Sequence, residues 1–245
     1  MPQIFKVGGC VRDKLLGVDS KDIDFTFVLD NLDRTVDDGF AIMTAWLQHY
    51  NFEIFLSTPS CYTIRAKFPK THQYAGMVAD FVMARKEIGY ETGTRRPILQ
   101  LGTLEDDLIR RDFTLNAMAE DEDGRLIDLF GGQEDLAKGI LRTPLPAEQT
   151  MMDDPLRFLR ALRFSITKGF EIDPEIFKAM MQPDIKAKLM QTVSAERIRE
   201  EVFKMMKHDT VKTLRMLNHV EQDFIPGFTS LIFSRGLWLK PTFEQ

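Results

Sequence analysis

The stretch Val7-Gly8-Gly9-Cys10-Val11-Arg12-Asp13, followed by Lys21-Asp22-Ile23-Asp24-Phe25-Thr26-Phe27, places a glycine turn shortly before two carboxylates one residue apart. Side chains of a strand alternate between its two faces, so Asp22 and Asp24 share one face while the apolar residues face a core. Two neighbouring acids repel each other, and a divalent cation between them removes the repulsion. Mg²⁺ prefers carboxylate oxygens together with the phosphates of a substrate. The pattern therefore predicts a metal-dependent nucleotidyl transfer site that takes a nucleoside triphosphate.

The glycine pair fits the same prediction. Backbone N–H groups at Gly8 and Gly9 can approach a triphosphate closely, and Arg12 adds a forked donor. Each feature alone has a simpler explanation, because a Gly-Gly pair is often only a tight turn and Asp-x-Asp only a solvated strand face. No P-loop string of the form Gly-x-x-x-x-Gly-Lys-Ser/Thr is present. The combination at this short spacing favours the nucleotide site.

Two further segments of the first half are candidates for function. Asp80 lies in the apolar run Val78–Val82, where it is a candidate third metal carboxylate. The alternative is a structural ion pair with Arg85 or another base. The segment Lys86–Thr103 contains several glycines and shows no clear period, so we expect a long mobile loop. Such loops are often functional in compact domains, although a connector without a role is the alternative.

The segment Arg110–Ala119 begins with two adjacent bases, continues with an acid that can cap a helix, and ends in an apolar stretch. In isolation this is the charged start of a helix. Beside a metal-binding pair of acids, Arg111 becomes a candidate ligand of the triphosphate. Asp112 and Asn116 are candidate nucleotide-binding residues next to it.

The segment Asp153–Phe164 carries arginines at steps of three residues along one side of a helix, a pattern often found on a solvated face. Asp154 only accepts hydrogen bonds and Arg157 only donates them, one helical turn apart. The Watson–Crick edges of cytosine and adenine both present a donor beside an acceptor, and uracil and guanine present the reverse. The Asp154–Arg157 pair therefore predicts selection of C and A by about 1–3 kcal/mol. Arg160 and Arg163 would remain to hold phosphate or to position the pair.

The composition is that of a globular protein. The chain has 245 residues, of which 44% are hydrophobic, and its net charge of −5 combines an acidic first half with a basic second half. Its two cysteines make no disulfide framework, the N-terminus shows no signal-peptide pattern, and no apolar run is long enough to cross a membrane. We expect a cytoplasmic protein that binds no membrane.

Hydrophobic periodicity predicts a mixed α/β first part and a helical second part. Residues 3–30 are expected to form a strand, a glycine turn, a short helix and a strand, with a helix following over 36–50. Further strands are predicted at 52–56, 61–68, 77–82 and 125–130. Helices are predicted from Asp154 onward and at 174–181 and 194–207.

The segments Gly8–Asp24, Arg110–Ala119, Asp153–Phe164 and Ser194–Ile198 together resemble the conserved strings of class II tRNA nucleotidyltransferases, the CCA-adding enzymes, in the same order. The resemblance implies an α+β protein, with a polymerase-β-like nucleotidyltransferase head of mixed sheet and helices and an all-α neck. It implies a head over 1–140, a neck over 141–207 that carries the nucleotide-templating helix, and a short body remnant over 208–245.

The same resemblance implies an activity and the residues that perform it. The expected reaction is Mg²⁺-dependent addition of C and A, from CTP and ATP, to the 3′ end of tRNA. Asp22 and Asp24 would bind the metal; the expected nucleotide contacts are Gly8, Gly9, Arg12, Arg111, Asp112, Asn116, Asp154, Arg157, Arg160 and Arg163. The segment Lys86–Thr103 occupies the place of the family's flexible element for switching from C to A.

Two departures leave alternatives. Bacterial poly(A) polymerases are close relatives of this family and usually carry a Gly-Arg-Arg-Phe-like string. The corresponding stretch here, Ser57–Tyr62, lacks it. Addition of A alone, or extension of another RNA, remains an alternative. The family commonly continues well beyond the neck, whereas this chain ends soon after Ser194–Lys207. This departure leaves three alternatives for holding the RNA: a homodimer, a partner protein or a shorter RNA substrate. The alternative of another class is a non-catalytic nucleotide-binding or RNA-binding module.

Overall fold

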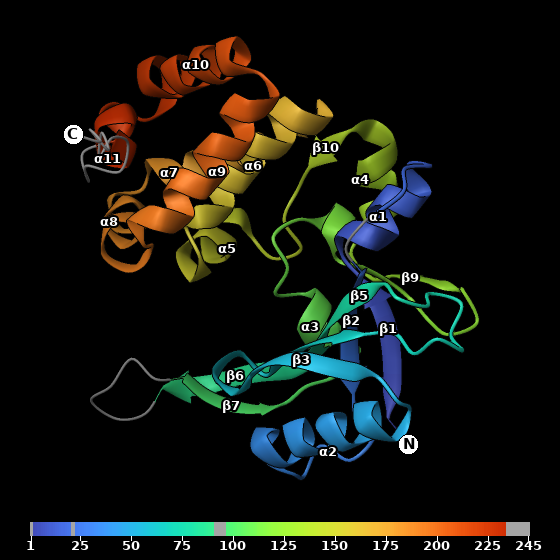
Figure 1. The fold of residues 1–245 in the computed structure, drawn as a ribbon. Coiled ribbons are helices and arrows are strands. Elements are labelled where there is room, and N and C mark those ends of the chain that lie inside the picture. Colours follow the sequence, from blue (N-terminus) through green and yellow to red (C-terminus); the bar gives the residue numbers. More distant parts are fainter. Residues whose placement is uncertain (1, 21–22, 91–96, 234–245) are drawn as a thin grey trace, which may run out of the picture. The chain divides into compact units, whose positions relative to one another are not determined.

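The computed structural model describes residues 2–20, 23–90 and 97–233. The chain divides into two compact units, Met1–Gln133 and Glu134–Gln245 (Figure 1). The first unit is built around a mixed sheet and the second is mainly helical.

The sheet of the first unit has seven strands in the order β3-β4-β5-β2-β1-β8-β9. β2 and β5 run parallel, and every other neighbouring pair in this sheet is antiparallel. The strands are β1 (Gln3–Val7), β2 (Ile23–Val28), β3 (Glu53–Thr58), β4 (Thr63–Lys67), β5 (Val78–Met83), β8 (Met118–Glu120) and β9 (Leu126–Asp128).

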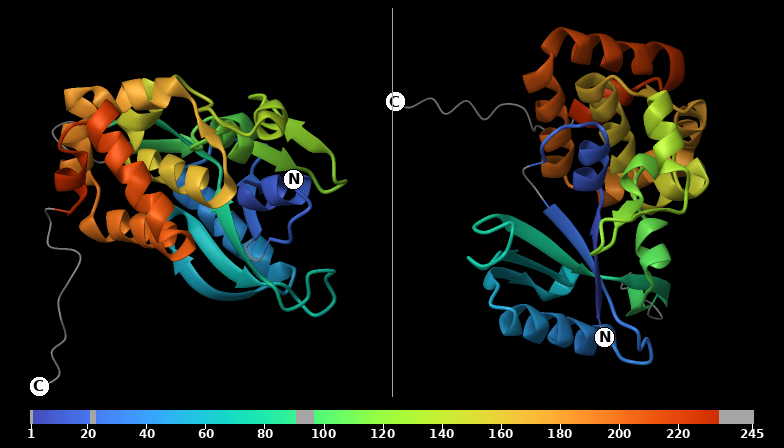
Figure 2. Two further views of the ribbon diagram at one scale, coloured as in Figure 1. Left: turned by 90° about the horizontal axis from the view of Figure 1, so that it is seen from above. Right: turned by 90° about the vertical axis from the view of Figure 1, so that its right-hand side faces the viewer.

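One face of this sheet is covered by the long helix α2 (Val36–His49), which Figures 1 and 2 show lying along it. Phe27 of β2 and Phe81 of β5 belong to the same buried core as Met43 and Leu47 of α2. Burying side chains of this size contributes about 1.5–3 kcal/mol each, so this core stabilises the unit strongly.

The opposite face of the sheet packs against short elements. Helix α1 (Gly9–Leu15) follows the glycine turn, and helix α3 (Leu104–Leu108) precedes the Arg110–Ala119 segment. A smaller core contains Val7 of β1, Leu108 of α3 and Ala119 of β8. The side chains that alternate with the Phe25–Phe27 face of β2 therefore lie on this second side of the sheet.

The segment from 86 to 103 is not the structureless loop that the sequence predicted. β6 (Arg85–Tyr90) and β7 (Pro97–Leu101) pair antiparallel as a hairpin, and residues 91–96 lie outside the described residues. The register shifts between Glu87 and Gly89. That shift interrupts the alternation of side chains by which a strand is recognised, while the pairing itself is made by backbone groups that leave no sequence pattern.

The second unit contains a set of short helices and one small parallel sheet. Its elements are β10 (Ile140–Leu141), α5 (Ala147–Asp153), α6 (Leu156–Lys168), β11 (Glu171–Ile172), α7 (Pro174–Met181), α8 (Pro183–Thr192), α9 (Ala195–His208), α10 (Thr210–His219), a π-helical turn (Val220–Phe224) and α11 (Phe228–Phe233); α4 (Gly132–Lys138) begins at the end of the first unit. α6 packs against α9, and Leu159 of α6 and Val202 of α9 are fully buried.

The α+β fold class is confirmed, as are the strand, turn, helix and strand at the N-terminal end and the helices at 36–50, 174–181 and 194–207. The expected helix after Arg110 is wrong, because Thr114–Asn116 forms a single 3₁₀ turn and Met118–Glu120 continues as strand β8. Pairing of β8 with β1 overrides the local helical signal. Within the described ranges, no helix is long and apolar enough to cross a membrane.

Candidate nucleotide site and templating helix

Antiparallel pairing brings the glycine turn next to Asp24, one of the two predicted metal-binding acids. Val7, the last residue of β1, is the register partner of Asp24 near the start of β2. Gly8 follows Val7 directly and has a φ of 76°, in the region that favours glycine. The turn and the Asp24 carboxylate therefore lie side by side, because β1 and β2 are antiparallel neighbours with α1 between them in the chain.

The guanidinium of Arg111 lies against this turn. A Cβ atom placed on Gly8 would be 2.7 Å from Arg111 Nη1, and one placed on Gly9 would be 3.6 Å from Arg12 Nη2. Two arginines predicted from distant motifs thus flank the two glycines. Such a concentration of donors beside a glycine turn is suited to an anionic ligand such as a triphosphate.

Arg12 is held by a chain of buried side chains. Its Nη1 donates to Asn116 Oδ1 over 2.6 Å, and the Asn116 amide donates to Asp112 Oδ1 over 2.9 Å. Asp112 also accepts from the backbone N–H of Phe113, and Asp13 accepts from Arg12 Nε and Nη2. The structure thus brings Arg12, Asp112 and Asn116 together. Asp112 serves there as a hydrogen-bond acceptor for Asn116 and for the backbone of Phe113.

Sequence reasoning missed Asp107. This carboxylate is only 4% exposed and accepts from Arg111 Nη2 at 2.8 Å, Arg110 Nη2 at 3.2 Å and the Thr26 hydroxyl at 2.7 Å. Burial alone would raise the pKa of Asp107, and the charge and hydrogen bond of Arg111, with Arg110 and Thr26, lower it below its ordinary value. The spacing of Asp107 to the two arginines, three and four residues along, was the available signal.

Asp80 of β5 is the register partner of Asp24 across the parallel β2–β5 pair. Arg65 of β4 donates to both of its carboxylate oxygens, over 2.7 and 2.6 Å. The ion pair that the sequence offered as the alternative is present, with Arg65 as the base and not Arg85. A sheet neighbour supplies this partner, which no local pattern could identify.

Asp22 lies outside the described residues. Among the described ranges, no group of three or more His, Cys, Asp or Glu side chains gathers as a metal centre. Asp24 and Asp80 are register partners and lie on the same side of the sheet.

In the second unit, Asp154 stands between α5 and α6 and is bound by the neighbouring helix. Arg197 Nη2 of α9 donates to Asp154 Oδ2 over 2.8 Å, and the backbone N–H of Leu156 donates to Asp154 Oδ1. Arg157 Nη1 donates to the carbonyl of Thr150 over 3.3 Å. The acceptor and the donor of the predicted pair are thus each oriented by another element.

Arg163 of the arginine stripe is bound by an acid of the neighbouring helix. Its Nε donates to Glu201 of α9, a carboxylate only 5% exposed, and Arg160 Nη1 lies 3.9 Å from the same group. Glu201 was also missed, because a buried acid on an otherwise charged helix has no local signature. The contact is compatible with the prediction that Arg163 positions the Asp154–Arg157 pair, and the prediction that it holds phosphate stays open.

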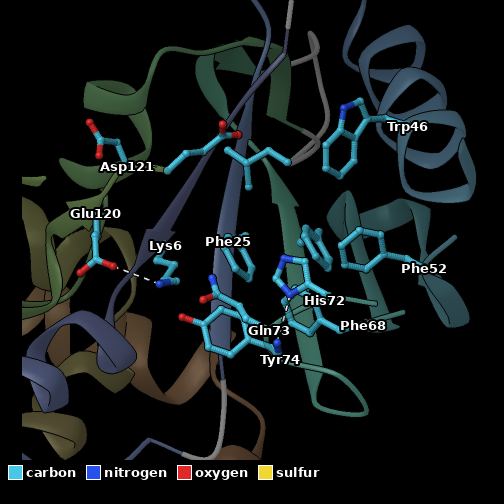
Figure 3. Close-up of a pocket in the computed structure, with 13 residues that line it drawn as sticks. Lys6, Phe25, Trp46, Phe52, Phe68, His72, Gln73, Tyr74, Glu120 and Asp121 are labelled. Carbon is cyan, nitrogen blue, oxygen red and sulfur yellow. Dashed lines mark hydrogen bonds and ion pairs between the residues drawn. The ribbon is translucent and has the colours of Figure 1, made fainter. Parts of the chain in front are cut away.

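A separate pocket of about 300 Å³ lies on the α2 side of the sheet (Figure 3). Aromatic side chains including Phe25, Phe68 and Tyr74 line it, and the Lys6–Glu120 ion pair stands at its edge. Phe25 and Asp24 point to opposite faces of β2. The pocket is therefore distinct from the glycine turn, and none of the predicted site residues that the structure describes lines it.

Comparisons with known proteins give the class of this arrangement. The fold matches that of the Bacillus stearothermophilus CCA-adding enzyme in complex with CTP, with a TM-score of 0.68 and 27% identity over 98% of this chain and 56% of that one. A tRNA nucleotidyltransferase complexed with a primer tRNA and an ATP analogue matches with a TM-score of 0.63 and 28% identity, over 90% and 57% of the chains. The first unit is thus a nucleotidyltransferase head.

Residues 4–142 match the poly(A) polymerase head domain, and residues 169–229 match the probable RNA- and SrmB-binding site of polymerase A. The chain belongs to this poly(A) polymerase head-domain family, whose relatives include CCA-adding enzymes.

Two curated relatives show the extent of the similarity. The multifunctional CCA protein of Neisseria gonorrhoeae is 38% identical over 217 residues, which are 88% of this chain and 47% of the relative. The mitochondrial CCA tRNA nucleotidyltransferase of Saccharomyces cerevisiae is 36% identical over 209 residues, 81% of this chain and 37% of the relative. The chain thus spans less than half the length of these relatives.

Proposed function

We propose that this chain transfers C and A from CTP and ATP to the 3′ end of tRNA. The observation that carries the proposal is the arrangement at Gly8, where Arg12 and Arg111 flank a glycine turn beside Asp24. Relatives and structures named as CCA-adding enzymes, with CTP, an ATP analogue or tRNA, support the choice of substrates.

In the proposed reaction, the RNA 3′-hydroxyl attacks the α-phosphate in line and pyrophosphate leaves. Arg12 and Arg111 bind and orient the phosphates through forked donors. Asp22 and Asp24 would hold Mg²⁺, which supplies activation of the hydroxyl and neutralisation of the leaving charge when bound. The carboxylate of Asp24 is a hard oxygen ligand of the kind that Mg²⁺ prefers.

Asp80 fits the metal less well than Asp24. Both of its oxygens accept from Arg65, so a metal would have to replace a bidentate ion pair. We therefore assign Asp80 to the pairing of β5 with β4, through its register partner Arg65.

Base choice is assigned to Asp154 and Arg157, whose acceptor and donor match the edges of C and A. We assign residues 1–140 to the catalytic head, residues 141–207 to the templating neck, and residues 208–245 to the body region that follows it. A cytoplasmic location is proposed too, supported by two free cysteines, Cys10 and Cys61.

The experiment is incubation of the purified chain and Mg²⁺ with tRNAs ending before CCA, after C and after CC, with each labelled nucleotide given singly and in pairs. Ordered addition of C, C and A is the expected result. Addition of A alone to the CC end would narrow the function to A addition, and extension of an unrelated RNA would indicate a poly(A) polymerase-like activity. CTP binding without incorporation on any RNA would contradict the proposal and favour a binding module.

The Asp24→Asn variant tests the metal assignment in the same assay. It retains the size of the side chain and removes the charge, so incorporation is expected to fall by a factor of about 100 or more. Light scattering of the chain, alone and with tRNA, tests whether a homodimer holds the RNA.

A further inference from the structure

Asp107 connects Arg111, the arginine proposed to bind the triphosphate, with β2, the strand that bears Asp24. Its carboxylate receives Arg111 Nη2 from four residues along the chain and the hydroxyl of Thr26 from β2. Thr26 is fully buried and stands two residues after Asp24, on the same side of the strand. One buried carboxylate thus joins two parts of the site that are far apart in sequence.

The contacts of Arg111 show what this carboxylate controls. Arg111 Nη2 is held by Asp107 at 2.8 Å and lies 3.4 Å from Thr26 Oγ1, while Nη1 is the atom next to Gly8. The Nε atom of Arg111 is buried without a hydrogen-bond partner within the described part of the chain. The direction of the guanidinium is therefore set at its Nη2 end, which leaves Nη1 directed at the glycine turn.

A buried acid is expensive unless its partners are well placed, and Arg110 supplies a third donor at 3.2 Å. Apolar side chains in place of the whole buried ion pair are often as stabilising as the pair, so stability alone does not require charges here. A carboxylate at this position is instead suited to hold one planar guanidinium in one orientation.

We propose that Asp107 is a positioning residue for nucleotide binding, which holds Arg111 against the Gly8 turn and couples it to the Asp24 strand through Thr26. This inference rests on the proposed function. Asp107 itself contacts no phosphate, because its oxygens are engaged by Arg111, Arg110 and Thr26.

The test compares the Asp107→Asn variant with the wild-type chain and with Asp106→Asn. Asp106 is the matched control, because it neighbours Asp107 on α3 but only caps the helix through Thr103. The dissociation constant of CTP with Mg²⁺ is measured by calorimetry, and KM and kcat are measured in the tRNA assay. We expect at least a tenfold weaker CTP affinity and a matching rise in KM for Asp107→Asn, and less than a threefold change for the control.

Variants at Thr26 keep the test decisive if Asp107→Asn does not fold. Thr26→Val removes the hydroxyl but retains the shape and leaves Asp107 in place, whereas Thr26→Ser restores the hydroxyl. CTP affinity is expected to fall several-fold in the valine variant and to return in the serine variant. A merely structural role would lower the unfolding midpoint of the valine variant and leave its CTP affinity unchanged.

The outcomes separate this inference from the proposed function. Wild-type CTP affinity in a folded Asp107→Asn variant, or an equal loss in Asp106→Asn, overturns the role of Asp107 and leaves the proposed function standing. CTP binding without incorporation by the wild-type chain contradicts the proposed function, while the comparison of affinities still decides the role of Asp107. A wild-type chain that binds no CTP overturns both.

Discussion

Arg197 donates its Nη2 to Asp154 Oδ2 over 2.8 Å, so the carboxylate before the arginine helix is held by a residue of α9 that lies far along the chain. The guanidinium leaves the other oxygen, Asp154 Oδ1, to accept from Leu156 N–H. Both oxygens of Asp154 thus act as hydrogen-bond acceptors, the role that the proposed base choice gives to this side chain.

Arg197→Ala is therefore expected to relax base choice more than it destabilises the fold. Without this partner Asp154 gains rotational freedom, and discrimination of CTP and ATP against UTP and GTP should fall by about 1 kcal/mol, or roughly fivefold. The pair is partly exposed, so the free energy of unfolding should change by less than about 1 kcal/mol. Misincorporation ratios and urea unfolding measure the two effects. Arg199→Ala, whose guanidinium lies near Phe203 instead, is the control, and an equal loss there would contradict the role of Arg197.

Glu201→Ala should destabilise the second unit. Glu201 is buried and compensates Arg163, whose side chain is 16% exposed. Its removal leaves a largely buried charge unpaired, which costs about 3 kcal/mol, reduced where water reaches the guanidinium. Chemical denaturation measures this change. The exposed neighbour Glu200 provides the matched control variant, Glu200→Ala. An equal fall in the free energy of unfolding in both variants would contradict a stabilising role of the buried Arg163–Glu201 pair.

Gly8→Ala should impair nucleotide binding in addition to straining the backbone. The positive φ alone costs about 1 kcal/mol for a residue with a side chain, and the new Cβ would lie 2.7 Å from Arg111 Nη1. Gly17→Ala isolates the backbone cost, because Gly17 has a φ of 67° and no atom within 4 Å of an added Cβ. CTP affinity should fall at least tenfold in the first variant only. Equal affinities in the two would show that Arg111 does not act at the turn.

Asp107 should make stability depend on acid pH. Burial opposes its ionisation, but the charge and hydrogen bond of Arg111 outweigh that effect and hold the folded-state pKa of Asp107 below its ordinary value. A depressed pKa stabilises the fold above the unfolded value of about 3.9, and this contribution is lost as pH falls through the folded pKa. The stability difference between the wild type and Asp107→Asn should therefore be largest near neutral pH and shrink below about pH 4. Urea unfolding from pH 7 to pH 3 measures it, and a difference independent of pH would contradict the assignment.

The two cysteines should differ in reactivity. Burial raises the pKa of the Cys10 thiol, which also donates to the carbonyl of Val7 over 3.2 Å. Cys61 is exposed. A thiol reagent at neutral pH should modify Cys61 at least tenfold faster than Cys10. In the Cys61→Ser variant, the one remaining thiol, Cys10, should react slowly. Rapid reaction of that remaining thiol would show that the glycine turn opens readily.

Local patterns predicted much of this fold. The Gly-Gly turn between a strand and a helix, the alternation around Asp24, and the apolar stripes of α2 and α9 each lie within a few residues of the chain and bear directly on backbone conformation. Patterns failed where pairing decides the outcome. The β6–β7 hairpin and strand β8 are made by hydrogen bonds between backbones, which any side chain permits.

The sequence by itself determined the family, the α+β class and the identity of the arginines and acids available for chemistry. Only the tertiary structure decided their partners: Arg65 for Asp80, Asp107 for Arg111, and Glu201 for Arg163. The physical reason is that a charge can be buried only beside a partner placed within hydrogen-bond distance. Such placement depends on strand register and helix packing, which bring together residues that the linear order keeps apart.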